Sequence, residues 1–130
     1  KQVGVQCFGK SFIPLAEFMP VHEYVKLIST CSCVIMNHLR QQAMGNIIIM
    51  MYLGAKIFLQ KSNPAYLFFK EQGAFVFSID EFQREGEILK KLQPSEIEIN
   101  RAILRTHWSR KAIQEKTKNL VEAVYLFHRS

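Results

Sequence analysis

The sequence lacks the GxGxxG string of dinucleotide-binding Rossmann proteins, so a protein of that class is not expected. Residues 4–11 (GVQCFGKS) match the letters of the P-loop string GxxxxGK[ST], but they overlap a predicted strand and turn, and no helix is predicted directly after them. Because a P-loop lies between a strand and the start of a helix, a P-loop protein is not expected. No GxSxG nucleophile elbow is present either. The cysteines are few and odd in number (Cys7, Cys31 and Cys33), so a secreted disulfide scaffold is not expected.

Long hydrophobic runs are also missing. The longest, residues 47–53, ends at Gly54, whereas a spanning helix needs about 20 apolar residues. A content of 48% hydrophobic and 22% charged residues in 130 residues predicts one globular domain with a sizeable core. Because the chain begins with Lys1 rather than methionine, we expect its natural N-terminus to be missing.

Positive charge is in excess, with a formal net charge of +6. Such an excess favours phosphates, nucleic acid or an acidic membrane surface as partners, or simply reflects a solvated basic face. Nucleic acid is disfavoured, because the basic residues concentrate in the C-terminal region and the aromatic residues have the spacing of core positions. Cys31, Cys33 and His38 do not have zinc-site spacing, so no metal site is predicted.

Predicted strands and helices alternate along the chain. Apolar patterning and turn residues predict strands at 1–8, 17–19, 32–36, 55–59 and 74–78, and helices at 21–30, 47–53, 64–73, 80–92 and 95–130 with a junction at 107–109. Alternation of this kind indicates an α/β fold with a Rossmann-like parallel sheet, helices on both faces and a helical C-terminus.

Several residues are predicted to fix the helix ends. Asn46 and Gly54 would begin and end the buried helix at 47–53. Asp80 would cap the helix that follows the third clear strand. Ser95 with Glu98 has the spacing of a capping box.

The loop after the strand ending at Met36 is the best candidate for a functional site. Ligands of parallel sheets bind beyond the carboxyl ends of the strands, and this loop leads into the positive end of a buried helix. Arginine, amide and glycine donors suit a phosphate or diphosphate, and the loop contains no carboxylate. The alternative is an ordinary solvated loop. The predicted site residues are Asn37, His38, Arg40, Gln41, Gln42, Gly45 and Asn46.

The same loop carries a resemblance to a known enzyme family. The string Phe18-Met19-Pro20-x-x-Glu23-Tyr24, the strand after it, and then Asn37-His38-x-Arg40-Gln41-Gln42-Ala43-x-Gly45-Asn46 resemble the C-terminal domain of the TDP-4-acetamido-4,6-dideoxygalactose transferases. These are GT-B glycosyltransferases (family 56) of enterobacterial common antigen synthesis. The likeness runs from about Phe12 to about Phe82, and the Asn-His-x-Arg-Gln-Gln-Ala-x-Gly-Asn string is its most specific part.

The resemblance implies a donor-binding domain, over residues 1–130, of an enzyme whose N-terminal acceptor domain is absent. The whole enzyme would move a deoxy-amino sugar from a TDP-sugar to a polyprenyl-diphosphate-linked glycan at the cytoplasmic face of the bacterial inner membrane, as a peripheral protein. No metal or other cofactor would be needed, and the catalytic base would lie on the absent domain. Met19 and Pro20 are the expected contacts for the nucleoside.

A different class of function stays open at this stage. The chain would then be a non-catalytic α/β module that binds a nucleotide or phosphate for interaction rather than for chemistry. For the full enzyme, His38 is expected to contact phosphate or sugar and not to act as a base, because no carboxylate nearby in the sequence orients it.

Overall fold

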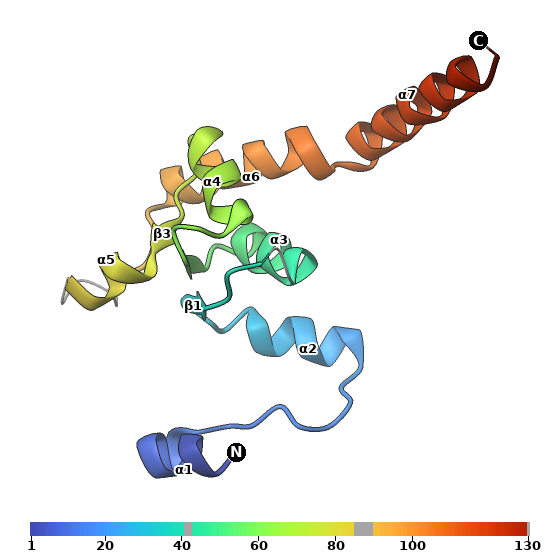
Figure 1. Cartoon of the computed structure of the whole chain (residues 1–130). Coiled ribbons are helices and arrows are strands. Elements are labelled where there is room, and N and C mark those ends of the chain that lie inside the picture. Colours follow the sequence, from blue (N-terminus) through green and yellow to red (C-terminus); the bar gives the residue numbers. More distant parts are fainter. Residues whose placement is uncertain (41–42, 85–89, 130) are drawn as a thin grey trace.

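Helices and a small parallel sheet make up the chain (Figure 1). The computed structural model describes residues 1–40, 43–84 and 90–129. In order, the elements are α1 (Gln2–Phe8), the 3-10 helix η1 (Gly9–Ser11), α2 (Val21–Ile28), β1 (Cys33–Met36), α3 (Met44–Tyr52), β2 (Lys56–Leu59), α4 (Pro64–Glu71), β3 (Phe77–Ser78), α5 (Ile79–Arg84), α6 (Pro94–Trp108) and α7 (Arg110–Arg129). The mixed α/β class is therefore confirmed.

The three strands are parallel and lie in the order β1-β2-β3. The register aligns Met36 with Leu59 and Leu59 with Ser78, so all three strands end at the same edge. Helices α3 and α4 connect successive strands, as crossover connections in a parallel sheet require.

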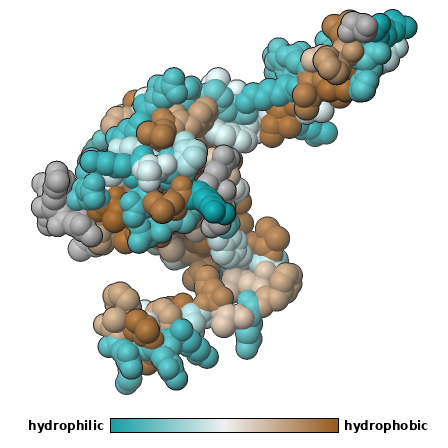
Figure 2. All heavy atoms as spheres, viewed as in Figure 1, coloured by the Kyte–Doolittle hydropathy of each residue, from teal (hydrophilic) through white to brown (hydrophobic). Residues whose placement is uncertain are grey.

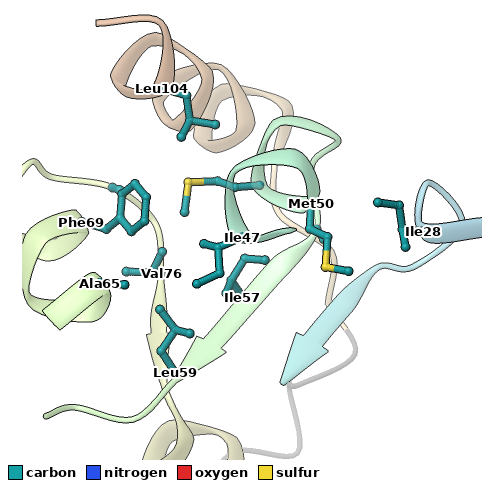
Figure 3. Packing of buried hydrophobic residues seen from close by; sticks show 12 residues of the cluster. Ile28, Ile47, Met50, Ile57, Leu59, Ala65, Phe69, Val76 and Leu104 are labelled. Carbon is teal, nitrogen blue, oxygen red and sulfur yellow. The ribbon is translucent and has the colours of Figure 1, made fainter. Parts of the chain in front are cut away.

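One face of the sheet carries the main core (Figure 3). Ile57 and Leu59 of β2 are fully buried there against Ile47 of α3 and Phe69 of α4. Leu104 brings α6 into the same cluster. Removing the apolar surface of these side chains from water contributes the main favourable free energy of folding, at roughly 25 cal/mol for each Å² that is buried.

The opposite face is covered less completely. Phe58 is 2% exposed and packs on Phe77 and on Phe82 of α5, with ring centroids 5.6 and 5.3 Å apart. Ile35 of β1, by contrast, is 48% exposed. Described helices thus lie on both faces, as predicted, but unequally.

The N-terminal part corrects two predicted strands. Residues 2–8 form α1, because an apolar alternation this short specifies a strand only where a neighbouring strand pairs with it. Residues 17–19 form no strand either. The predicted helix at 21–30 is confirmed as α2, which ends at Ile28.

The third strand is shorter than predicted for a specific reason. The Asn100 side chain accepts a hydrogen bond from the Phe75 N–H at 2.7 Å and donates to the Phe75 carbonyl at 3.2 Å. An α6 side chain thereby replaces a strand as the partner of this backbone, and β3 begins only at Phe77.

Three predicted caps are wrong, although the helices themselves exist. Helix α3 begins at Met44 after Ala43, which places Asn46 inside the first turn. In α5 the reciprocal bonds join Ser78 and Glu81, not Asp80. In α6 the Glu96 carboxylate accepts a hydrogen bond from the Gln93 N–H at 2.7 Å, so the cap of the helix lies two residues before the cap predicted at Ser95. Pro94 occupies the first helical position of α6 instead of ending a helix.

The other helix boundaries agree with the sequence in part. Asn63 caps α4 by accepting from the Ala65 N–H at 2.9 Å, with Pro64 at the first helical position, as predicted. The helix predicted at 80–92 is wrong at its end, because residues 90–93 are not helical. Helix α5 is described from Ile79 to Arg84, and residues 85–89 lie outside the described residues. Extended backbone at Ser109 separates α6 from α7, which confirms the predicted junction. No helix in the described ranges is both long and apolar enough to cross a bilayer.

Candidate functional site

Because the three strands end at the same edge of the sheet, the two polar segments that follow β1 and β2 meet there. One follows β1 and begins with Asn37, and the other follows β2 and begins with Gln60. The Gln60 side-chain amide donates a hydrogen bond to the Asn37 side-chain oxygen. This contact joins the two loops directly above the sheet edge.

Asn63 ties the candidate loop to the fold. This side chain is fully buried. Its nitrogen donates to the His38 carbonyl at 3.0 Å and, at a longer 3.4 Å, to the Arg40 carbonyl. Since its oxygen caps α4, one amide fixes both the start of a helix and the path of the loop over the sheet edge.

The first turn of α3 is open to an approaching ligand. Gly45 is exposed, and a Cβ built on it would meet no heavy atom within 4 Å. The first hydrogen bond of the helix joins the Ile47 N–H to the Ala43 carbonyl at 3.0 Å, so the N–H groups of residues 44–46 have no partner within the helix. Unpaired N–H groups and the helix dipole favour an anion here.

Ala43 holds the turn that leads into this helix. Its φ of 52° and ψ of 30° are left-handed, and it is the one non-glycine residue with positive φ in the described part of the chain. A left-handed alanine costs roughly 1–2 kcal/mol relative to the right-handed form. The surrounding contacts therefore maintain a turn that the local sequence disfavours.

Asn46 is held from a second helix. The Tyr24 hydroxyl of α2 donates to the Asn46 side-chain oxygen at 3.1 Å. With its oxygen engaged in this way, the amide has its NH2 group left to donate to a ligand. The α2 helix thus takes part in positioning the first turn of α3.

The electrostatic surroundings favour negative ligands. No aspartate or glutamate occurs in residues 24–70, while Arg40 lies exposed in the candidate loop. The guanidinium of Arg40 has no hydrogen bond or ion pair to another described residue. At the neighbouring strand end, Asp80 pairs with Lys61 at 3.4 Å. Burial, and then the carboxylates of Glu81 and Asp80, raise the pKa of Tyr66, which is therefore a neutral phenol at neutral pH.

The predicted site residues divide into three groups. Asn37, His38 and Arg40 lie at the sheet edge, and Gly45 and Asn46 lie on the first turn of α3. Gln41 and Gln42 lie outside the described residues. Met19, one of the two predicted nucleoside contacts, lines a separate hollow of about 350 Å³ together with residues 13–18. Pro20, the other predicted nucleoside contact, immediately precedes α2.

Three residues of the site were missed from the sequence. Tyr24, Gln60 and Asn63 each make a hydrogen bond to the predicted loop or helix. Gln60 could have been identified as the polar residue that follows a parallel strand, since that position meets the same edge. Asn63 was predicted only as part of the helix start, and its second role depends on tertiary structure.

A second hollow can be set apart from this site. It has a volume of about 330 Å³, lies between the C-terminal halves of α3 and α6, and is lined mainly by apolar side chains such as Ile49 and Trp108. It lacks the converging polar donors of the sheet edge, so it is a poorer candidate for binding a charged ligand.

Comparisons with known proteins leave the site to be judged on its own geometry. No family model, no curated protein and no solved structure matches the chain. Among the described residues, no group of three or more histidine, cysteine or acidic side chains comes together as a metal site would require. The geometry defines an open, carboxylate-poor helix terminus at the carboxyl edge of a parallel sheet.

Proposed function

We propose that the chain is the donor-binding domain of a glycosyltransferase of the GT-B type. In the full enzyme, it would hold the TDP part of a TDP-sugar while a deoxy-amino sugar passes to a polyprenyl-diphosphate-linked glycan. A Rossmann-like arrangement is part of this proposal, and so is a peripheral position at the cytoplasmic face of the bacterial inner membrane. The resemblance of the loop after β1 to the family 56 transferases supports it.

One structural observation carries the proposal. The N–H groups of residues 44–46 have no partner within α3, and the exposed Arg40 precedes them by four residues at the carboxyl edge of the sheet. Departure of a nucleoside diphosphate generates negative charge on its oxygens, and preorganised donors stabilise such charge. Arg40, Gly45 and Asn46 supply a cation, a close approach and an amide for this purpose without requiring a metal.

The chemistry on the acceptor lies outside this proposal for the chain itself. A base to deprotonate the acceptor hydroxyl is assigned to another domain, as the resemblance implies. The 130-residue chain is therefore expected to bind the nucleotide without transferring sugar. Sugar transfer by this chain alone would contradict that division of roles.

Binding of nucleotides tests the proposal directly. Thermal shift and calorimetric titration would compare TDP, UDP, GDP and inorganic phosphate on the 130-residue chain. We expect TDP to stabilise the chain most and Arg40→Ala to weaken its binding by roughly ten- to a hundredfold, since a hydrogen bond to a charged group is worth about 1.5–3 kcal/mol.

The matched control is Arg110→Ala, which removes an exposed arginine at the start of α7. This variant is expected to bind TDP like the wild-type chain. If Arg40→Ala and Arg110→Ala weaken TDP binding equally, the net charge of the chain, and not a contact from Arg40, determines the affinity. Binding of inorganic phosphate with no preference among the nucleotides would favour a non-catalytic phosphate-binding module, and silence toward all four ligands would reject the site.

A further inference from the structure

Helix α7 projects from the rest of the chain and leaves a large apolar surface uncovered (Figures 1 and 2). Its 20 residues include none that is buried. Leu120 is 64% exposed, Val121 is 61% exposed and Val124 is 48% exposed. Helices are normally stabilised by packing their apolar face, so an exposed one of this length indicates a partner surface.

Most of the large apolar side chains of α7 lie on one side of the helix. Successive residues are about 100° apart around a helix axis, which places Ile113, Leu120 and Val124 within about 40° of one another. Val121 and Phe127 extend this face to about 120°. The face runs along nearly the whole helix, from its first turn to its last.

The charged side chains of α7 are distributed around that face in a definite order. Lys116 lies at one border of the apolar face. Lys111 and Lys118 lie on the polar side, roughly 60–80° beyond the other border, where Lys118 pairs with Glu122 at 3.8 Å. Glu115 and Glu122 lie opposite the centre of the apolar face. Helix α7 carries five lysine and arginine side chains against two glutamates. An excess of basic side chains beside an apolar face is typical of a helix that lies in a membrane interface, where they reach anionic headgroups.

We propose that α7 binds the surface of an anionic lipid bilayer, with its apolar face in the headgroup region and its lysines on the phosphates. The net positive charge of α7 argues for an anionic lipid surface over a second copy of the same positively charged helix. In a coiled coil along Ile113, Leu120 and Val124, the bordering positions 114, 116, 121 and 123 would offer no opposite charges to pair. This proposal rests on the peripheral membrane position that forms part of the proposed function and assigns it to one helix, but it does not depend on nucleotide binding at the sheet edge.

Vesicle flotation tests the proposal with the 130-residue chain. Vesicles of phosphatidylcholine alone are compared with vesicles that also contain phosphatidylglycerol. We expect binding to the anionic vesicles only, and a loss of binding as salt is raised, because the attraction is screened. Lys118→Gln should lower the partition coefficient roughly fivefold.

A matched pair of leucine variants tests the orientation. Leu120 lies on the apolar face, whereas Leu126 has a similar exposure of 67% but lies on the opposite side of the helix. Leu120→Ser should lower the partition coefficient roughly tenfold or more, and Leu126→Ser should change it little. Both residues are exposed, so circular dichroism and thermal unfolding should be unchanged in either variant.

Three outcomes would overturn the proposal. The first is equal binding to neutral and anionic vesicles. The second is an equal effect of the two leucine variants. The third is absence of vesicle binding, whether the chain stays monomeric or forms a concentration-dependent dimer in sedimentation, since the latter would assign the face to a second copy. None of these outcomes bears on TDP binding, so the two proposals fail separately.

Discussion

At the scale of single residues, Gly45 separates the needs of the fold from those of the proposed ligand. It occupies an exposed position in the first turn of α3, with open space where a Cβ would stand. A glycine inside a helix costs roughly 0.5–1 kcal/mol relative to alanine, and this turn contains no acidic residue to complement the helix dipole. The fold alone would therefore favour a different residue here.

Gly45→Glu is accordingly expected to raise stability and lower affinity together. The free energy of unfolding, measured with urea, should rise by about 0.5–1.5 kcal/mol because a better helix former now places negative charge at the positive helix end. The dissociation constant for TDP should increase at least tenfold, since like charges a few Å apart repel by about 4 kcal/mol at an effective dielectric constant of ~20.

Gly45→Lys provides the control of opposite charge. It adds a long side chain at the same position, but its ammonium attracts a diphosphate. We expect it to bind TDP at least as tightly as the wild-type chain. If both variants bind equally weakly, bulk rather than charge excludes the nucleotide, and the electrostatic account of the site is wrong.

Burial acts on another single residue, Cys33 of β1. Desolvation raises the pKa of its thiol above 9.0, and the positive charge of Lys56 opposes that shift more weakly. Cys33 is therefore protonated at neutral pH and behaves as a small hydrophobic residue of the sheet. Its position in β1 agrees with the strand predicted at 32–36.

At the scale of elements, Asn63 connects the start of α4 to the loop after β1. Asn63→Ser keeps a side-chain oxygen for the cap but removes the donor to the His38 carbonyl, whereas Asn63→Ala removes both. A lost cap costs about 1 kcal/mol, and a buried group without its partner costs about 1–3 kcal/mol. Urea denaturation should therefore order the stabilities as wild type, Asn63→Ser and Asn63→Ala.

Nucleotide binding should follow a different order. Both variants lose the bond that holds the loop, so both should bind TDP equally weakly although their stabilities differ. Asn119→Ser, an exposed asparagine on α7, is the control and should change neither quantity. Wild-type affinity in Asn63→Ser would show that the loop does not need this tether.

The elements also show which features a sequence can disclose. The unbroken apolar run at 33–36 and the apolar residues at 57–59 predicted two strands, because these signals are local. The Asn63-Pro64 pair predicted the start of α4 in the same way. The backbone bonds of Phe75 are taken by Asn100, 25 residues away, and no local pattern indicates such a pairing. The predicted cap at Ser95 failed because a similar pattern two residues earlier, Gln93 with Glu96, competes with it.

The candidate site was predictable to a similar extent. The loop and the helix terminus followed from the rule that ligands meet the carboxyl ends of parallel strands. Tyr24 and Gln60, by contrast, reach the site through side-chain contacts between residues more than 20 positions apart. The left-handed turn at Ala43 is equally hidden, because the local preference of alanine opposes it.

At the scale of the whole molecule, the buried residues lie between Ile28 and Leu104. A chain that ends after Ser109 keeps all of them and loses α7 residues of which none is buried. Its free energy of unfolding should therefore stay within about 0.5 kcal/mol of the full chain, measured by urea denaturation. A chain that ends after Gln93 loses Asn100 and Leu104 and should not fold, as circular dichroism would reveal.

A large loss of stability in the chain that ends after Ser109 would contradict the expectation that α7 adds little to the stability of the fold. Such a loss would mean that α7 packs onto the remainder of the chain in solution. The same truncation should abolish binding to anionic vesicles while TDP binding stays intact, which separates the two surfaces within one molecule.

The single extended residue between α6 and α7 has a mechanical consequence. The Ser109 N–H bonds back to Arg105, while its carbonyl and hydroxyl accept from Ile113 and Ala112 in the next helix. Rotation about the N–Cα bond of Ser109 moves those two acceptors together with α7 and breaks neither set of bonds. The exposed hydrogen bond from the Lys116 ammonium to the His107 carbonyl is one contact between the two helices across Ser109. Helix α7 can therefore change its tilt relative to α6 while both helices stay intact.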